Sequence, residues 1–408
     1  MSRAPRRVVV TGLGCICALG NDVTASWAAA RSGQGGIGPL TRVDPASVKY
    51  PIAGEVRGFL PEQRMEPQWV QRLDRFAQLG LAAGQEAVRD AGLTIDRELG
   101  LRSAVVLGSG IGGIETLNEG FKRLYVQQIN RVYPLSVPKV MLNGAVSALA
   151  MIHGIRGPAF AVSSACSSSN HAAAQALWLV RSGQVDLAIT GGSEASLTHG
   201  MLKGWEALRV LAPDGCRPFC LERRGVVLGE GAGILVLESL DHAQQRGARI
   251  YGELAGCGLS SDAGDLVLPD PDGAERAMRS ALEDAGLAPE DIDYVNAHGT
   301  GTQANDAVET RALHGVFGAH ARRLAVSSTK SLHGHALGAA GGIEAVLTLK
   351  AMQEGLIPPT IGYGTPDPEC DLDYVPNQAR SQPIRAALSN SFAFGGLNAV
   401  LAFRRLTD

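Results

Sequence analysis

The chain has 408 residues, of which 45% are hydrophobic and 19% are charged, and its formal net charge is −3. A chain of this length and composition can bury a large core without disulfide or metal support. The small net charge excludes a globally basic surface, so we expect no nucleic acid partner. We also expect no membrane span, because no apolar run reaches about 18 residues.

The seven cysteines are odd in number and scattered, which argues against a disulfide framework and favours a reducing compartment, the cytoplasm. Cys15 lies two residues from Cys17, and Cys216 lies four residues from Cys220. Neither pair has a second Cys or His pair at the spacing of a zinc site. We interpret all four as structural and expect no metal.

The N-terminal stretch resembles a signal peptide at first sight, because several arginines precede an apolar run that begins at Val8. Thr11, Gly12 and Gly14 interrupt that run, so we predict a buried first strand from Val8 to Val10 that enters a glycine turn. The periodicity then predicts a helix over 23–32 and one long amphipathic helix over 68–90.

A strand over 103–107 leads into the glycine-rich turn 108–113, and helical pieces follow over 117–154. The turn only half matches the fingerprint of a dinucleotide site, because its glycine spacing is wrong and no acidic ribose partner is evident. We interpret Ile111, within this turn, as a candidate pocket wall.

The most informative stretch is F-A-V-S-S-A-C-S-S-S-N-H-A at 160–172. A short apolar strand ends at small hydroxyl residues, and an alanine-rich helix follows Cys166. At such a strand-to-helix turn the free N–H groups and the helix dipole favour thiolate over thiol. Cys166 is therefore a candidate nucleophile, although a buried structural cysteine is the alternative.

A second copy of this setting occurs at 325–336, which reads A-V-S-S-T-K-S-L-H-G-H-A. The two copies share Ala, Val, two Ser, a later Ser, His and Ala in register. Lys330 takes the place of Cys166, and His335 takes the place of His171. A further echo pairs 87–93 with 281–287, each ending a helical pattern at a glycine. The chain is therefore predicted to be duplicated.

Strands continue to alternate with helices, with strands predicted near 186–190, 234–238, 249–255 and 293–297, so the chain is an α/β protein with mainly parallel sheets. The strand at 293–297 delivers His298 into a Gly/Thr-rich segment that lets a ligand approach the backbone. A lone histidine is often structural, so His298 and His335 are candidates only.

Four motifs resemble those of the β-ketoacyl-ACP synthase II group of condensing enzymes, with features of its nodulation-type members. They lie at 160–171, 296–302, 327–335 and 390–398, in the order and spacing of the family. The resemblance implies the thiolase fold, with two duplicated α/β halves in a layered α-β-α-β-α arrangement. We place the halves at 1–248, with Cys166, and at 249–408, with His298, Lys330 and His335.

The resemblance also assigns roles to single residues. Cys166 resembles the nucleophile that accepts the acyl group, His298 and His335 resemble the pair that acts on the extender unit, and Lys330 resembles the lysine that orders this pair. The remaining assignments are Asp306 and Glu344 as supporting carboxylates, Thr300 and Thr302 as contacts of the phosphopantetheine arm, the N–H groups of Cys166 and Phe394 as the oxyanion hole, and Ile111, Trp205, Phe392 and Phe394 as walls of the acyl pocket.

The implied activity is a ping-pong, decarboxylative Claisen condensation of malonyl-ACP with an acyl group on Cys166, without metal or dissociable cofactor. It would serve fatty-acid biosynthesis or a specialised acyl or polyketide pathway. The implied partner is the acidic acyl carrier protein, whose docking would use basic residues that are otherwise ordinary surface charges: Arg72, Arg75, Arg131, Lys203 and Arg209.

The family also implies a homodimer formed through the strand before the nucleophile, with 133–137 closing the acyl pocket of the partner. A heterodimer with a ketosynthase-like subunit is the alternative. His333 and Trp205 replace residues common in the family, threonine and phenylalanine, which favours a specialised pathway over housekeeping elongation.

Three rival classes fit the residues less well. A degradative thiolase needs a second cysteine in the motif at 390–398, which has none, and a synthase III has asparagine where His335 stands. A non-catalytic partner subunit of a heterodimeric ketosynthase usually lacks the nucleophile, whereas Cys166 is present.

Overall fold

The computed structural model describes residues 5–406, and the same five-strand pattern occurs twice in it. The first half contains β1 (Val8–Ile16), α1 (Val23–Arg31), β2 (Gly38–Pro39), β3 (Ile52–Ala53), α2 (Pro67–Arg72), α3 (Arg75–Asp90), α4 (Arg97–Leu101), β4 (Ser103–Gly108), α5 (Ile114–Phe121), α6 (Ser136–Val140), α7 (Gly144–His153), β5 (Ala159–Val162), α8 (Ser168–Arg181), β6 (Leu187–Glu194), α9 (His199–Leu208), β7 (Gly231–Ser239) and α10 (Leu240–Gln245).

The second half contains β8 (Gly252–Ser261), α11 (Pro271–Ala285), β9 (Tyr294–Asn296), α12 (Gln303–Phe317), β10 (Ala325–Ser327), α13 (Lys330–His333), α14 (Ala340–Glu354), β11 (Leu356–Ile357), β12 (Arg380–Ser381), β13 (Ala386–Ala393) and β14 (Leu397–Arg404). Its strands follow the order β10-β9-β13-β14-β8, and those of the first half follow β5-β4-β6-β7-β1. Parallel and antiparallel pairings occur at matching places in both halves, two of each kind in each half. The predicted duplication is therefore confirmed. The prediction of mainly parallel sheets is wrong: β7 and β14 run antiparallel to the strands before them, and the short turn between β13 and β14 permits no other pairing.

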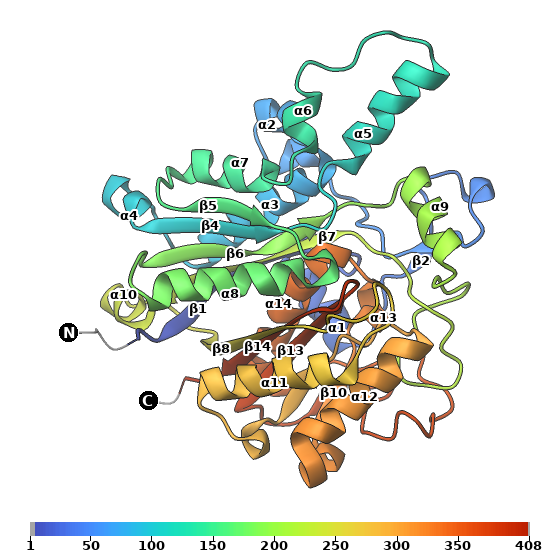
Figure 1. Cartoon of the computed structure of the whole chain (residues 1–408). Helices are drawn as coiled ribbons and strands as arrows, with labels where there is room; N and C mark the ends of the chain where they lie inside the picture. The colour runs from blue at the N-terminus through green and yellow to red at the C-terminus, as the bar shows by residue number, and fades with distance from the viewer. Residues whose placement is uncertain (1–4, 407–408) are drawn as a thin grey trace.

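The halves stack as five layers (Figure 1). Helices α3 and α7 cover one face of the first sheet, α8 and α14 fill the space between the two sheets, and α11 and α12 cover the outer face of the second sheet. The two sheets also join along one edge, where β1 pairs with β8 over Val9 and Val10. Separate apolar clusters occupy the spaces between neighbouring layers. The α-β-α-β-α arrangement is confirmed.

Close helix–sheet packing in the middle layer depends on glycine. A Cβ atom on Gly342 of α14 would lie 2.3 Å from the carbonyl oxygen of Gly233 on β7, which is far inside van der Waals contact. This contact holds α14 directly against the first sheet, and α14 carries Glu344.

Two predicted elements differ from the structure. The strand at Val8 does not end in a glycine turn but runs to Ile16, because Gly12 and Gly14 serve close packing against α3. A Cβ atom on Gly14 would lie 1.9 Å from the carbonyl oxygen of Ala83. The helix predicted over 68–90 is broken into α2 and α3, because Asp74 leaves the helix and accepts a hydrogen bond from the N–H of Phe76 as the N-cap of α3.

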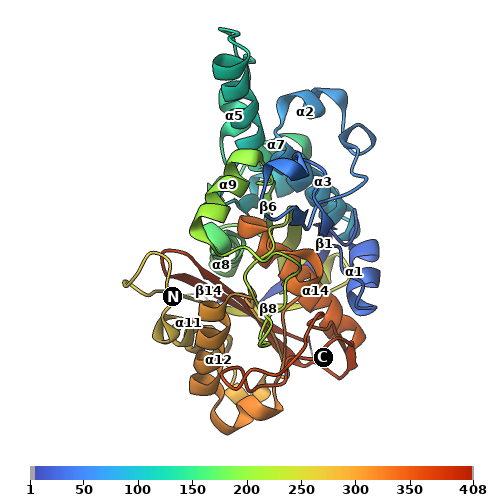
Figure 2. The same ribbon diagram turned by 90° about the vertical axis from the view of Figure 1, so that its right-hand side faces the viewer.

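The segment between β4 and β5 projects beyond the layered body as α5 and its neighbours, in both views (Figure 1, Figure 2). Its exposed surface is apolar at Tyr125, Val126 and Val137. Within residues 5–406, no helix is long and apolar enough to cross a membrane.

Candidate active site

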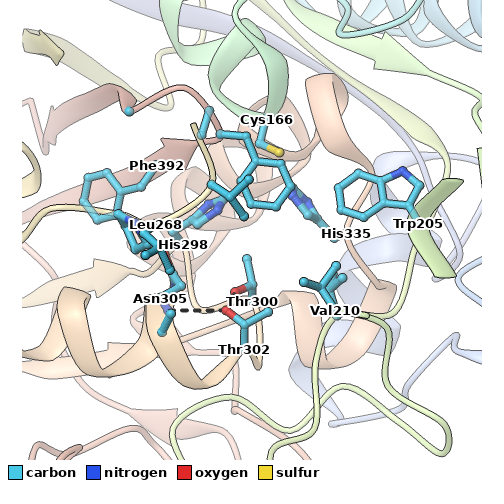
Figure 3. A pocket seen from close by; sticks show the side chains of 17 residues that line it. Cys166, Trp205, Val210, Leu268, His298, Thr300, Thr302, Asn305, His335 and Phe392 are labelled. Carbon is cyan, nitrogen blue, oxygen red and sulfur yellow. Dashed lines mark hydrogen bonds between the residues drawn. The ribbon is translucent and has the colours of Figure 1, made fainter. Parts of the chain in front are cut away.

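A cavity of about 160 Å³ lies between the halves and contains most of the predicted catalytic residues (Figure 3). Its walls come from both halves: turns after strands carry Cys166 and His298, whereas Trp205 lies on α9 and Phe392 on β13. The lining residues are Cys166, Trp205, Val210, Val226, Val267, Leu268, Pro269, His298, Thr300, Thr302, Ala304, Asn305, His335, Phe392, Ala393, Phe394 and Gly396.

Cys166 lies in a single 3₁₀ turn, Ala165–Ser167, between β5 and the first residue of α8. We expected the helix end to favour the thiolate, but burial raises the pKa of the Cys166 thiol to about 12. The charge of Lys330 and the backbone N–H groups of Phe394 and Cys166 only partly oppose this rise. Cys166 is therefore a thiol in the resting site, and the two N–H groups predicted for the oxyanion hole both lie at its sulfur.

His298 and His335 face each other across the cavity. Their ring centroids lie 5.4 Å apart and the ring planes are almost perpendicular, at 86°. His298 follows β9, and His335 follows the short helix α13, which ends at Gly334 with a φ of 75°. The Nδ1 atom of His298 and both ring nitrogens of His335 have no hydrogen-bond partner among the described residues.

Both imidazoles are held in the neutral form. Burial, and next the positive charge of Lys330, lower the pKa of His298 and of His335 well below the ordinary value of histidine. A neutral imidazole carries one N–H group and one free lone pair. The site therefore presents neutral donors to a ligand, with ring nitrogens that the protein leaves unpaired.

Lys330 does not line the cavity but lies behind it, in an ion pair with Glu344. Both side chains are fully buried. Lys330 begins α13, at the place that corresponds to Cys166 in the first half. Its paired charge thus lies within electrostatic reach of the thiol and of both histidines.

Asp306, on α12, accepts hydrogen bonds from the N–H groups of Phe219 and Gly301, at 2.9 and 3.2 Å, so it fixes the threonine-containing loop. Burial raises the pKa of Asp306 to about 6. The carboxylate nearest His298 is one that the sequence analysis missed, Glu309, which accepts from the N–H groups of His298 and Gly299, both at 2.8 Å. Glu309 follows Asp306 by three residues on the same helix. Because residues at this spacing share a helix face, the sequence could have indicated Glu309 as a second carboxylate near the site.

Thr300 and Thr302 both line the cavity, and their hydroxyl oxygens lie 2.8 Å apart. Thr302 also begins α12, where its hydroxyl accepts from the N–H of Asn305 at 3.4 Å (Figure 3). These side chains form the polar part of a largely apolar lining.

The predicted acyl walls divide into two groups. Trp205 stacks on Phe394, with centroids 5.7 Å apart and an angle of 24° between the rings, and both line the cavity, as does Phe392. Ile111 does not line it but packs into the apolar cluster that includes Cys166. The sequence analysis missed the loop 267–269, whose residues lie between β8 and α11 and carry no periodic pattern.

Of the predicted docking residues, Arg72, Arg131, Lys203 and Arg209 are exposed. Lys203 lies on α9, the helix that carries Trp205, and forms an ion pair with Glu206. Arg209 directly follows this helix. Arg75 is unsuited to docking. Its guanidinium is almost buried and donates to both carboxylate oxygens of Glu230, at 2.8 and 2.7 Å, so no free charge faces solvent.

Comparison with known proteins matches both halves of the chain. The β-ketoacyl synthase N-terminal domain matches residues 5–243, and the β-ketoacyl synthase C-terminal domain matches residues 251–364. The chain is 47% identical over 401 residues to nodulation protein E of Rhizobium sp. (strain N33), which covers 98% of this chain and 100% of the relative. It is 44% identical over 407 residues to 3-oxoacyl-[acyl-carrier-protein] synthase 2 of Staphylococcus aureus (strain COL), with 98% of each chain covered.

Solved ketosynthase structures are also similar to this chain. The ishigamide ketosynthase/chain length factor has a TM-score of 0.94 and 38% identity, covering 99% of this chain and 100% of that chain. The ketosynthase of the type II polyketide complex AntDE:AntF, which holds its acyl carrier protein, has a TM-score of 0.90 and 34% identity over 98% of this chain and 100% of that chain. Together with the cavity that unites Cys166, His298 and His335, these matches mean that the chain belongs to the β-ketoacyl synthase family of condensing acyltransferases.

Proposed function

We propose that the chain is a β-ketoacyl-[acyl carrier protein] synthase that extends an acyl group held on Cys166 with a two-carbon unit from malonyl-ACP. The observation that carries this proposal is the common cavity of Cys166, His298 and His335. A thiol beside two backbone N–H groups suits acyl transfer, and two neutral imidazoles suit the stabilisation of an enolate.

In the first half-reaction the sulfur of Cys166 attacks the thioester carbonyl of acyl-ACP. The N–H groups of Cys166 and Phe394 stabilise the oxyanion of the tetrahedral intermediate. When the intermediate collapses, the phosphopantetheine sulfur leaves and takes up the proton that Cys166 loses. The high pKa of the buried thiol means that attack and proton loss must be closely coupled.

In the second half-reaction malonyl-ACP enters with its arm along Thr300 and Thr302. Loss of carbon dioxide leaves an enolate, whose oxygen accepts hydrogen bonds from His298 and His335. The enolate carbon attacks the acyl-Cys166 carbonyl, the carbon–sulfur bond breaks, and Cys166 takes up one proton to return to the thiol. These steps use only the residues of the chain and its two substrates, so we propose that no metal or dissociable cofactor takes part.

The carrier protein is proposed to dock on the side of the cavity where α9 lies. Lys203 and Arg209 are exposed there, close in sequence to Trp205 of the cavity wall. The carrier is acidic in this class of system, so opposite charges would guide the encounter. Arg72 and Arg131, farther along the surface, are further candidates for this contact.

A second copy of the chain is proposed to pair along β5. This strand is at the outer end of the sheet, so one of its edges has no partner strand within the described residues, and Phe160 on it is exposed. Exposed edges of this kind are usually covered. The apolar side chains of Tyr133 and Val137 would then lie at the partner's pocket. A ketosynthase-like subunit is the alternative occupant, and the retained Cys166 argues against a non-catalytic role for this chain.

The biosynthetic role is proposed to be a specialised one in the cytoplasm, where the free cysteines stay reduced. The identity to nodulation protein E, 47%, is slightly higher than that to 3-oxoacyl-[acyl-carrier-protein] synthase 2, 44%. The indole of Trp205 at the acyl wall is consistent with a primer preference of its own.

The division of roles between sulfur and imidazole predicts two classes of mutant. Cys166→Ala should abolish acyl transfer but retain decarboxylation of malonyl-ACP, because the enolate is stabilised by His298 and His335. His298→Ala and His335→Ala should each lower decarboxylation by about 10²- to 10³-fold, as expected for the loss of one such donor. Radiometric release of carbon dioxide measures this step. Decarboxylation at the wild-type rate in both histidine variants would show that the roles are assigned wrongly.

Removal of the buried positive charge should change the protonation of the histidines. In Lys330→Met the pKa of His298 and His335 should rise, because the positive charge that lowers both values, second only to burial, is lost. Decarboxylation should slow, while Cys166 should still react with iodoacetamide. Histidine ¹⁵N NMR titration measures the pKa values. Lys350→Met is the matched control, because it removes a lysine of α14 that pairs with Glu354 and is not fully buried. Unchanged titration midpoints would mean that Lys330 does not set the charge of the imidazoles.

Trp205 is predicted to limit the acyl chain. Its indole stacks on Phe394, and a packed wall resists added volume at a cost of about 1 to 3 kcal/mol. Trp205→Phe and Trp205→Ala should therefore form acyl-enzyme with longer or bulkier primers than the wild type. Trp178→Phe, at an exposed position on α8, controls for the loss of an indole elsewhere. A length profile that does not change, together with a lower melting temperature, would assign Trp205 to the core.

A further inference from the structure

The turn that presents Cys166 has an unusual backbone. Ala165, directly before the nucleophile, has a φ of 50°, in the left-handed region that residues other than glycine rarely adopt. Such a conformation persists only where surrounding contacts hold it. Two of these contacts are local, because the Ser167 hydroxyl donates to the Ser164 carbonyl oxygen at 2.8 Å and the Ser168 hydroxyl donates to the Ala165 carbonyl oxygen at 2.6 Å.

A third contact comes from His171, one helical turn into α8. Its Nδ1 atom lies 2.9 Å from the hydroxyl oxygen of Ser164 and 3.1 Å from the carbonyl oxygen of Ser167. These two residues flank Ala165, with its strained backbone, and Cys166. The imidazole thus connects both ends of the turn.

The second half of the chain lacks this arrangement. There the Ser331 hydroxyl donates to the Ser328 carbonyl oxygen at 2.8 Å, as Ser167 does to Ser164, but Thr329 has an ordinary φ of −70°. The counterpart of His171 is His335, and no hydrogen bond joins its ring to the turn. The two histidines differ because the helices that carry the two turns end at different places. Gly334 ends α13 and directs His335 into the cavity, whereas α8 continues and keeps His171 over the turn.

We propose that His171 is a positioning residue, which holds the strained turn so that the sulfur of Cys166 lies at the N–H groups of Phe394 and Cys166. The proposal deepens the proposed function, because it names a further residue on which that site depends. His171 does not line the cavity, and it acts through its contacts with the Ser164 hydroxyl and the Ser167 carbonyl oxygen on either side of the nucleophile.

The contacts fix which proton the imidazole carries. A backbone carbonyl oxygen can only accept, so the contact with Ser167 needs the N–H on Nδ1, and the Ser164 oxygen can share the same proton. Neutral and protonated imidazoles can both carry this N–H. The role is therefore that of a hydrogen-bond donor and not that of a base for Cys166.

Two variants with the same number and branching of side-chain heavy atoms separate the donor from the shape of the side chain. His171→Asn keeps an N–H donor close to the position of Nδ1, and His171→Leu has none. Each would be made in the full-length chain and compared with the wild type for the rate of Cys166 alkylation by iodoacetamide over a range of pH, followed on the Cys166 peptide by mass spectrometry. Steady-state kcat and KM with acyl-ACP and malonyl-ACP would be measured in parallel.

His171→Leu should slow alkylation at every pH without changing the slope of the pH profile, and it should lower kcat by about 10- to 100-fold with little change in KM. His171→Asn should recover most of both rates. Wild-type rates in His171→Leu would overturn the proposal. So would equal losses in the two variants, or a changed slope, which would make His171 a base. Alkylation does not require condensation, so a wild-type chain that is alkylated but never condenses would contradict the proposed function and leave this proposal standing.

Discussion

The site depends on one buried ion pair, that of Lys330 and Glu344, in the layer between the two sheets. A buried charge must be paired, because an isolated ammonium group loses its hydration without compensation. The pair is held where α13 begins and where α14 packs against β7 without intervening side chains. From there the lysine charge lowers the pKa of His298, of His335 and of the Cys166 thiol together. One charge, placed by helix packing, therefore acts on three groups that act in sequence. It adds to the effect of burial on the two histidines, and it partly opposes the rise that burial causes in the pKa of Cys166.

Duplication explains how the fold supplies these parts. Each half ends a parallel strand, β5 or β10, at a serine-rich turn that faces the same central space. The first turn leads into α8 of the middle layer, and the second leads into the short helix α13, which precedes α14. The first half has cysteine at the turn and a continuous helix, and the second has lysine and a helix that stops at Gly334. The nucleophile and the charge that acts on it thus come from equivalent places in the two halves. Catalytic asymmetry arises from two local differences, one side chain and one helix end.

The sequence predicted the repeated α/β architecture, because the two serine-rich turns and the two helix ends recur in register. Turns after predicted strands also made Cys166 and His298 candidates, and the family resemblance added the roles and the pocket residues, but the loop 267–269 was not predicted. The sequence did not predict effects that depend on three-dimensional packing. Gly12 and Gly14 suggested a turn, but they lie in a strand against α3, and Asp74 interrupts a periodic helix. The Cys166 thiol was expected to ionise easily, yet burial outweighs the helix end. Arg75 had the charge of a docking residue, but its partner, Glu230, is 155 positions away in sequence.

One cavity is expected to carry both half-reactions through an acyl group on Cys166. Mass spectrometry of the intact protein and of its Cys166 peptide follows that acyl group. After incubation with acyl-ACP, we expect one acyl group per chain, located on Cys166, and its complete discharge as β-ketoacyl-ACP when malonyl-ACP is added. Absence of the adduct, its location on another cysteine, or an adduct that malonyl-ACP leaves unchanged would show that the two half-reactions do not share this cavity.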